Sequence, residues 1–200
     1  MKLDPRAVGS THMVSGMAEK VRFLQVDLSI HRSQLVDLNI EYMNWWSRGI
    51  EECFKTDLAT LLGWSREAVE SKKREYLTSE VEKLCSDPRG VYYLLELDGA
   101  MIGMGALHEL REGRGEIKRM YIRPAYRGRG HGKALLQQLL QRAKEFGYRS
   151  IYLDSGRFMT AAHKLYRSLG FIECDEYPET EIPPQFRPQW LFMEKLLDTT

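Results

Sequence analysis

A short segment near the middle of the chain combines three glycines with positively charged side chains. Glycine lets the backbone turn tightly and approach a ligand closely, so that successive N–H groups can point outward. The residues that follow have the apolar spacing of an amphipathic helix, whose first N–H groups have no partner in the helix and whose dipole is positive at that end. We therefore predict a phosphate or pyrophosphate site. The segment reads Arg127-Gly128-Arg129-Gly130-His131-Gly132-Lys133.

Two familiar phosphate loops do not fit this segment. A Walker loop requires a glycine, four further residues and then Gly-Lys-Ser/Thr. Here Gly132 and Lys133 are followed by Ala134, and Arg127 stands in the place of the first glycine. A dinucleotide-binding fingerprint requires a third glycine where Lys133 stands. RNA binding is the other alternative, and a formal net charge of +1 without interleaved aromatic residues argues against nucleic acid.

Position by position, the segment resembles the acyl-CoA pyrophosphate loop of the GNAT N-acetyltransferase superfamily. That family's signature is Gln/Arg-x-x-Gly-x-Gly/Ala, which Arg127, Gly130 and Gly132 match. Residues 120–126 resemble the family's strand end with its x-Pro-x-Tyr lead-in, and residues 165–171 resemble its Leu-Tyr-x-x-x-Gly-Phe element. The resemblance is strong between Glu116 and Phe171 and diffuse elsewhere, and the chain is identified by it as a member of this superfamily.

Length and composition indicate one domain. The 200 residues suit a single core, which we place in residues 17–200, behind a tag or disordered leader over residues 1–16. Three widely spaced cysteines without metal-ligand pairing are typical of a reduced, cytoplasmic protein. No apolar run approaches the roughly 20 residues that cross a bilayer, so no membrane contact is expected. Many relatives dimerise, which leaves a homodimer as an open alternative.

Apolar spacing and turn residues predict an α/β (α+β) fold with a mixed central sheet of about seven strands and helices on both faces, in agreement with the GNAT fold. Asp98-Gly99 between two strand-like runs predicts a hairpin. Strands are expected over residues 20–26, 91–97, 101–110, 116–122, 150–153, 171–175 and 190–196. Helices are expected over residues 27–46, 56–86, 135–146 and 159–169, and the charged residues 72–74 are expected on a solvated face.

The resemblance implies that acetyl-CoA is the acyl donor and that no metal takes part. In the family, the strand before the loop splays from its neighbour, and the pantetheine arm hydrogen-bonds the backbone groups that this leaves unpaired. The residues expected to bind the cofactor are therefore Met120, Tyr121 and Ile122 on the strand, and Arg127, Gly128, Arg129, Gly130, His131, Gly132 and Lys133 in the loop.

Tyr166 is the candidate catalytic acid. The resemblance implies that its hydroxyl lies beside the CoA sulfur and protonates the leaving thiolate, while a core tyrosine with a satisfied hydroxyl is the structural alternative. Many family members carry an asparagine seven positions earlier, where this chain has Met159. One polar contact to the cofactor is therefore expected to be missing.

Attack by an alkyl amine requires a base, because an amine with a pKa near 10.4 is almost wholly protonated at pH 7. Glu116 is the leading candidate, since it lies at the offset from the loop where histone-acetylating members carry their catalytic glutamate. A regular strand would place it on one face with Lys118, Met120 and Ile122. A structural ion pair for Glu116, His108 as the base, and a chain of ordered water molecules are the alternatives.

The acceptor is expected to contact the first helix, through Tyr42, Trp45 and Trp46, and the acidic, proline-stiffened residues 177–188. Core packing of at least one of the tryptophans and a solvated surface loop over residues 177–188 are the alternatives. The function predicted is an N-acetyltransferase that moves an acetyl group from acetyl-CoA to the primary amine of a small molecule, by direct attack in a ternary complex. The alternatives are a protein lysine or N-terminal acetyltransferase and a non-catalytic acyl-CoA sensor.

Overall fold

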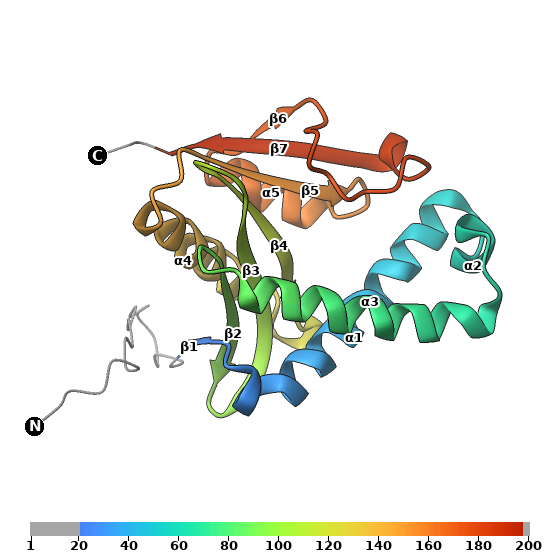
Figure 1. The fold of residues 1–200 in the computed structure, drawn as a ribbon, viewed down its shortest axis with the longest axis horizontal. Coiled ribbons are helices and arrows are strands. Elements are labelled where there is room, and N and C mark those ends of the chain that lie inside the picture. The colour runs from blue at the N-terminus through green and yellow to red at the C-terminus, as the bar shows by residue number, and fades with distance from the viewer. Residues whose placement is uncertain (1–20, 198–200) are drawn as a thin grey trace, which may run out of the picture.

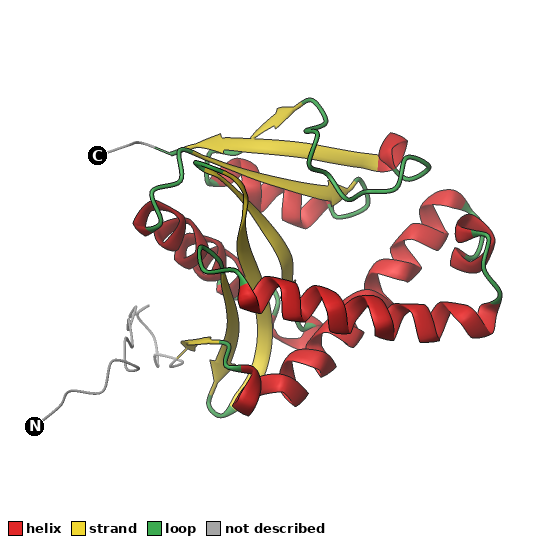
Figure 2. Ribbon diagram, in the orientation of Figure 1, coloured by secondary structure: helices red, strands yellow, loops and turns green. Residues whose placement is uncertain are grey.

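The computed structural model describes residues 21–197, so the leader predicted over residues 1–16 lies outside the described residues. Within them the chain forms one sheet of seven strands with helices on both faces (Figures 1 and 2), as the sequence predicts. The strands are β1 (Val21–Gln25), β2 (Val91–Leu97), β3 (Ala100–Arg111), β4 (Arg114–Ile122), β5 (Ser150–Gly156), β6 (Ile172–Cys174) and β7 (Trp190–Leu196). The helices are α1 (Leu28–Phe54), α2 (Leu58–Leu62), α3 (Arg66–Ser86), α4 (His131–Glu145) and α5 (Thr160–Ser168).

The sheet is mixed, with the strand order β1-β2-β3-β4-β5-β7-β6. The central pair β4 and β5 is parallel, and the other neighbours are antiparallel. Asp98 and Gly99 close the β2–β3 hairpin with φ angles of 48° and 84°. Two successive positive φ angles are what a two-residue hairpin turn requires, so the hairpin that Asp-Gly predicted is confirmed.

Two apolar clusters cover the two faces of the sheet. On one face α4 contributes the buried stripe that includes Leu135 and Leu139, and α5 contributes Tyr166. On the opposite face α1 and α3 pack through Leu38 and Leu84, among others. Because each face buries its own helix pair, the sheet is held rigidly enough to fix the direction of side chains on its central strands.

The strands β4 and β5 diverge after a short paired stretch. Residues 114–116 pair with residues 150–152, and within the described residues the β5-facing edge of β4 has no strand partner beyond this point. The other edge of β4 stays paired with β3 as far as Ile122. Backbone groups in a protein interior need hydrogen-bond partners, so this open edge can accept an extended ligand as an additional strand.

A β-bulge lies in β4 at Arg119, whose φ angle is 58°. The pairing with β3 shifts between Met104 and Ala106, so that two residues of β4 lie opposite one residue of β3. A positive φ angle is uncommon for a residue other than glycine and costs free energy that the surrounding structure must offset. The bulge lies directly beside the open edge, where it redirects the side chains that follow.

The bulge corrects one prediction about the faces of this strand. Met120 and Ile122 pack against the α4 cluster, while Tyr121 packs against the α1 and α3 cluster. Lys118 and Glu116 contact groups on the α3 side. The prediction that Met120 and Ile122 share a face with Glu116 is therefore wrong, because an inserted residue exchanges the two faces of a strand.

The helical part before β2 also differs from the prediction. The helix α1 continues eight residues past the predicted end at residue 46, as far as Phe54. The single helix predicted over residues 56–86 is divided into α2 and α3, because Gly63 ends α2 with a φ angle of 66° and the Ser65 side chain caps α3 by accepting from the N–H of Ala68. This division brings the start of α3 close to the end of α1 and α2.

None of the helices described is both long enough and apolar enough to pass through a membrane. The three cysteines Cys53, Cys85 and Cys174 are partly buried, and none forms a disulfide in residues 21–197.

Replacing Gly103 by alanine should destabilise the fold by about 1–3 kcal/mol, as overpacking a tightly packed position does. An added Cβ would lie 2.6 Å from the carbonyl oxygen of Tyr121 and 2.5 Å from Cδ1 of Ile122, so β4 itself would have to move. For a chain of this size each kcal/mol corresponds to about 2–4 °C in Tm, which thermal unfolding followed by circular dichroism measures.

The matched control is Gly105→Ala, two residues further along β3. There the added Cβ would meet only flexible side-chain ends, the closest at 3.0 Å, and these can move aside. Equal losses of Tm in the two variants would show that the approach of β3 to the β4 backbone does not limit packing.

Candidate active site

The glycine-rich loop lies at the N-terminus of α4. Gly128 and Gly130 have φ angles of 78° and 84°, in the left-handed region that favours glycine. A Cβ atom added at either position would meet nothing within 4 Å, so the space above the loop is open. Gly130 is the N-cap of α4 and brings no side chain to cap the helix. The loop and the positive end of the helix dipole therefore present a surface that fits an anion.

Side chains of the loop are oriented by their neighbours. The Nε of Arg127 donates to the carbonyl oxygen of Ile122 at 2.8 Å. Its guanidinium lies over the rings of Trp45 and Tyr121, at 5.2 and 5.6 Å from their centroids. His131 is buried at the start of α4. The predicted cofactor residues thus lie together along the end of β4 and the start of α4.

A cavity of 330 Å³ lies beside the open edge of β4. Its volume falls within the range of small-molecule sites, about 300–1,000 Å³. The aromatic residues predicted for the acceptor site, Tyr42, Trp45 and Trp46, line it from α1. Other lining residues come from α3, β4, β5 and α5, and Glu181, Ile182, Pro183 and Phe186 line it from the loop after β6.

The loop over residues 177–188 covers part of this cavity, as the sequence analysis proposed. Phe186 is 1% exposed and packs against Trp46, with ring centroids 6.1 Å apart. Tyr177 is buried at the other end of the loop and packs against Tyr152. Between these anchors, Glu181 forms ion pairs with two lysines. The loop is therefore fastened to the body of the protein at three places.

Glu116 lies in a buried polar cluster at the wall of the cavity. Its side chain is 2% exposed, and its oxygens are 2.7 Å from Nε2 of His108 and 2.5 Å from the hydroxyl of Tyr177. Burial alone would raise the pKa of Glu116, but the hydrogen bond to His108 and the charge of Lys118 lower it below its ordinary value. Glu116 is consequently an ionised carboxylate at neutral pH.

Asp154 lines the same cavity from β5, at the point where β4 and β5 have separated. One carboxylate oxygen accepts from Nε1 of Trp190 at 2.8 Å, and the other accepts from the Tyr177 hydroxyl at 3.2 Å. Burial raises the pKa of Asp154 to about 6, and the negative charge of Glu116 raises it as well. A carboxylate with a pKa close to neutral is well suited to accept and release a proton.

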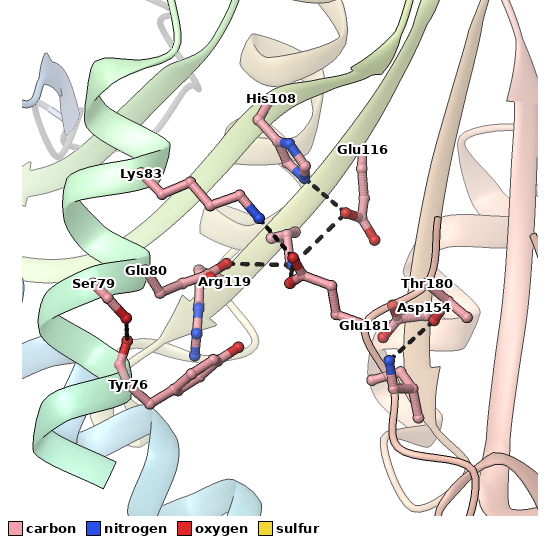
Figure 3. A network of polar contacts seen from close by, with 12 residues as sticks. Tyr76, Ser79, Glu80, Lys83, His108, Glu116, Arg119, Asp154, Thr180 and Glu181 are labelled. Atoms are coloured by element: carbon pink, nitrogen blue, oxygen red, sulfur yellow. Dashed lines mark hydrogen bonds and ion pairs between the residues drawn. The ribbon is translucent and has the colours of Figure 1, made fainter. Parts of the chain in front are cut away.

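Figure 3 shows a polar network in which Glu80 of α3, Glu116 of β4 and Glu181 of the covering loop lie close together. Lys118 forms ion pairs with all three carboxylates. Its Nζ lies 3.3 Å from Glu80, 2.5 Å from Glu181 and 3.8 Å from Glu116. Burial alone would lower the pKa of Lys118, but these carboxylates raise it above its ordinary value. In return, the ammonium group brings the pKa of Glu181 down to about 2 against the effect of burial. Lys118, Glu116 and Glu181 are therefore charged at neutral pH.

Tyr166 extends from α5 into the same cavity. Its ring is packed in the core on the α4 face, 6.0 Å from that of Phe171. Burial raises the pKa of Tyr166, and the nearby Tyr42 and Asp154 raise it further. Its role as an acid stays a prediction, with the buried core tyrosine as the alternative.

Two further predictions concern His108 and Met159. His108 lies behind Glu116, outside the lining of the cavity, with its Nδ1 3.1 Å from the carbonyl oxygen of Glu109. Met159 lines the cavity, and its sulfur accepts from the Ser155 hydroxyl at 3.3 Å. The cavity therefore has an apolar side chain at the position where an asparagine was expected.

Three residues of the site, Asp154, Tyr177 and Arg119, were not predicted from the sequence as candidate site residues. In the sequence Asp154 directly follows the apolar run 150–153, and one carboxylate there indicates a functional site only weakly. Its partner Tyr177 is 23 residues away along the chain. Lys72 is exposed, as predicted for the charged residues 72–74, and it also lines the cavity together with Lys73. Among the side chains described, no group of three or more His, Cys, Asp or Glu residues is arranged to hold a metal ion.

The strand order, the open edge of β4 and the glycine loop together define an acyltransferase type of architecture. Residues 55–171 match the model of the Acetyltransferase (GNAT) family. This chain belongs to the GNAT acetyltransferase family, as the residues of the loop predicted.

Several relatives are N-acetyltransferases by name. The N-acetyltransferase YjgM of Escherichia coli is 32% identical over 99 residues, which are 48% of this chain and 59% of that protein. The IAA acetyltransferase of Azospirillum brasilense is 35% identical over 100 residues, 50% of this chain and 63% of that protein. The N-acetylaspartate synthetase of Xenopus tropicalis is 36% identical over 95 residues, 46% of this chain and 35% of that protein. The chain spans less than two thirds of the length of each.

Solved structures share the fold over nearly the whole length. The PaiA N-acetyltransferase of Thermoplasma acidophilum, in complex with coenzyme A, has a TM-score of 0.66 at 20% identity, over 89% of this chain and 99% of that one. A GNAT acetyltransferase of Staphylococcus aureus has a TM-score of 0.63 at 18% identity, over 89% of this chain and 99% of that one. The mixed sheet described above is therefore the GNAT fold.

Replacing Lys118 by methionine should destabilise the protein by about 3–5 kcal/mol at pH 7, because Glu80, Glu116 and Glu181 lose the cation that they share. The loss should shrink as the pH falls from 7 to about 4. Without Lys118 the folded-state pKa values of Glu116 and Glu181 rise, so the variant regains stability when they are protonated. The wild type instead loses the stability that the lowered pKa values of these two carboxylates provide. Urea unfolding across this pH range measures both effects.

Lys83→Met is the matched control, since Lys83 pairs with the same Glu181 at 2.6 Å but is 55% exposed. A pair so exposed is worth about 0–1 kcal/mol. A Lys118 variant that loses no more than the Lys83 variant would contradict the central position of Lys118.

Proposed function

We propose that this chain transfers an acetyl group from acetyl-CoA to the primary amine of a small molecule, by direct attack of the amine in a ternary complex. The observation that carries the proposal is the cavity of 330 Å³ beside the open edge of β4. Asp154, a candidate base, and Tyr166, a candidate acid, both line it. Family membership supports acetyl transfer. The names of two relatives, an IAA acetyltransferase and an N-acetylaspartate synthetase, are in keeping with small acceptors.

The covering loop favours a small acceptor over a protein. A peptide substrate needs an open groove in which an extended chain can lie. Here residues 181–183 and 186 close one side of the cavity, and Glu181 holds them against Lys118. This arrangement supports a compact amine over a protein lysine or N-terminus.

Bound acetyl-CoA would supply the acetyl thioester. The loop from Gly128 to Lys133 would hold the pyrophosphate through backbone N–H groups at the start of α4. The backbone of Met120 and Ile122, next to the open edge, would bind the pantetheine arm. The open space above Gly130 supports this assignment, as does a structural neighbour that contains coenzyme A.

The amine proton is accepted, in this proposal, by two carboxylates that Tyr177 links. The Tyr177 hydroxyl reaches an oxygen of Glu116 at 2.5 Å and an oxygen of Asp154 at 3.2 Å. Glu116, the predicted base, has a lowered pKa, while the pKa of Asp154 is raised to about 6. The proton therefore resides on Asp154, and Glu116 contributes the negative charge that makes Asp154 more basic.

Tyr166 is the proposed acid. Its raised pKa keeps the phenol protonated at neutral pH, so that it has a proton to give to the leaving sulfur. The cytoplasmic location, the homodimer alternative and the absence of nucleic-acid and membrane partners stay predictions from the sequence.

Purified enzyme given acetyl-CoA and a panel of small amines should release free thiol, and Tyr166→Phe should lower kcat about 10²–10⁴-fold. The variant should bind acetyl-CoA as the wild type does, because the lost hydroxyl acts on the leaving group. Thiol detection measures turnover, and isothermal calorimetry measures acetyl-CoA binding.

Tyr148→Phe is the control for this variant. Tyr148 is also buried, but its hydroxyl donates to the carbonyl oxygen of Arg89 at 2.7 Å, away from the cavity. Acetyl-CoA binding without turnover on any amine would instead favour the non-catalytic sensor.

The pH dependence of kcat should report Asp154. At saturating substrates kcat should fall as the pH drops below about 6, because Asp154 then becomes protonated. Asp154→Asn should remove this limb and lower the plateau. Glu116→Gln should move the limb to lower pH, because the charge that raises the pKa of Asp154 is gone.

Glu96→Gln is a matched loss of one carboxylate, since Glu96 pairs with Arg22 at 2.6 Å on the opposite edge of the sheet. It should leave the limb at the wild-type pH. A limb that persists unchanged in Asp154→Asn would exclude Asp154 as its source.

A further inference from the structure

The bulge residue Arg119 points a buried guanidinium toward the acceptor cavity. The residue is 8% exposed and is among those that line the cavity. Its guanidinium lies 5.2 Å from the ring of Tyr76 and 5.7 Å from that of Tyr42, and Nη1 lies 3.3 Å from the sulfur of Met43. Figure 3 shows it between Tyr76 and Glu80 on the α3 side.

No carboxylate within residues 21–197 pairs with this guanidinium. Glu80, whose negative charge contributes to the raised pKa of Arg119, gives its ion pair to Lys118 at 3.3 Å instead. Aromatic rings and a thioether stabilise a cation only partly, so five N–H donors are held in the protein with few acceptors. Burying a charge without an anionic partner is costly, and such an arrangement persists where a ligand completes it.

Arg119 is one of several cations that line the cavity, and these cations differ in how they are paired. Of the cations that line it, Lys118 is neutralised by Glu116, Glu80 and Glu181. The mouth carries the exposed Lys72, which lies over the ring of Trp64. Arg119 is therefore the buried lining cation whose charge is left for a ligand, among the residues described.

The carboxylate of Asp154 lines the same cavity from β5, away from Arg119 on the α3 side (Figure 3). Tyr42 lines the cavity with both groups. Burial raises its pKa to about 12, the charge of Arg119 lowers it, and that of Asp154 raises it. Both groups therefore act on one hydroxyl. A ligand that carries a positive and a negative group would be matched at both ends by a cavity of this polarity.

Resting on the proposed function, we propose that the acceptor is an amine that also carries a carboxylate, with the carboxylate bound by Arg119 and the amine directed to Asp154. The planar fork of an arginine binds a carboxylate through two parallel hydrogen bonds, which fixes orientation as well as position. The bulge gives Arg119 this direction, because the side chain of an inserted residue leaves the regular alternation of the strand. Amino acids of a size that fits 330 Å³ are the substrate class.

The test compares amino acids with their carboxamides, each pair having the same carbon skeleton. With the wild type, kcat/KM corrected for the fraction of neutral amine should be about 10–100-fold higher for the acid than for the amide. In Arg119→Met this ratio should fall close to one, and a general change in activity cancels from the ratio because both members of a pair are measured on the same variant. Arg119→Lys keeps the charge without the fork and should give an intermediate ratio.

Arg114→Met is the matched control, because Arg114 lies on the same strand, also over a tyrosine ring at 5.2 Å, and does not line the cavity. It should keep the wild-type ratio. A wild-type ratio near one for every pair overturns the proposal, as does a folded Arg119→Met that retains the preference. If Arg119→Met does not fold, the wild-type and Arg119→Lys ratios decide.

A binding experiment separates this proposal from the proposed function. N-acetylated amino acids carry the carboxylate but have no amine to acetylate, and calorimetry with the wild type and Arg119→Met reports their binding. Heat that depends on Arg119 supports the carboxylate site even if no amine is turned over, a result that would remove the proposed function alone. Acetylation of amines without any carboxylate preference or binding would remove this inference alone.

Discussion

The separation of β4 from β5 is the constraint on which the site depends. Residues 114–116 and 150–152 hold the two strands in one sheet, and beyond them each strand follows its own half of the molecule. The bulge at Arg119 lies in this gap. An unpaired strand edge, a cavity beside it and a glycine loop at its end are consequences of one interruption in the pairing, and the helices packed on both faces keep that interruption from closing.

Charged side chains surround the gap between β4 and β5, where an apolar core would exclude them. Lys118 holds three carboxylates together at the α3 side, and Tyr177 joins Glu116 to Asp154 at the β5 side. The pKa of Glu116 is lowered because hydrogen-bonding and cationic neighbours outweigh its burial. The pKa of Asp154 is raised because it is buried beside the negative charge of Glu116. The same chemical group thus serves two purposes within one cluster.

The sequence predicted what is encoded locally. Asp98-Gly99 and the loop around Gly130 need particular φ angles, and glycine at fixed spacing reveals them. The bulge was not predictable, because Arg119 adopts a positive φ angle without any residue that favours one. The link from Asp154 to Tyr177 joins β5 to a distant loop, so it depends on the packing of the whole sheet. Glu116 and Tyr166 could be named as candidates because their positions relative to known motifs can be read from the sequence, and their roles stay predictions.

The loop over the cavity is fastened unevenly. Phe186 is inserted among aromatic rings with 1% of its surface exposed, and burial of such a ring is worth about 1.5–3 kcal/mol. Glu181, 42% exposed, is held by two lysines of different exposure. Its pair with the exposed Lys83 exchanges for water at little cost, whereas its pair with the largely buried Lys118 does not. Dissolved salt should therefore weaken the outer contact of the loop to α3, and leave its aromatic end and its inner contact to Lys118 in place.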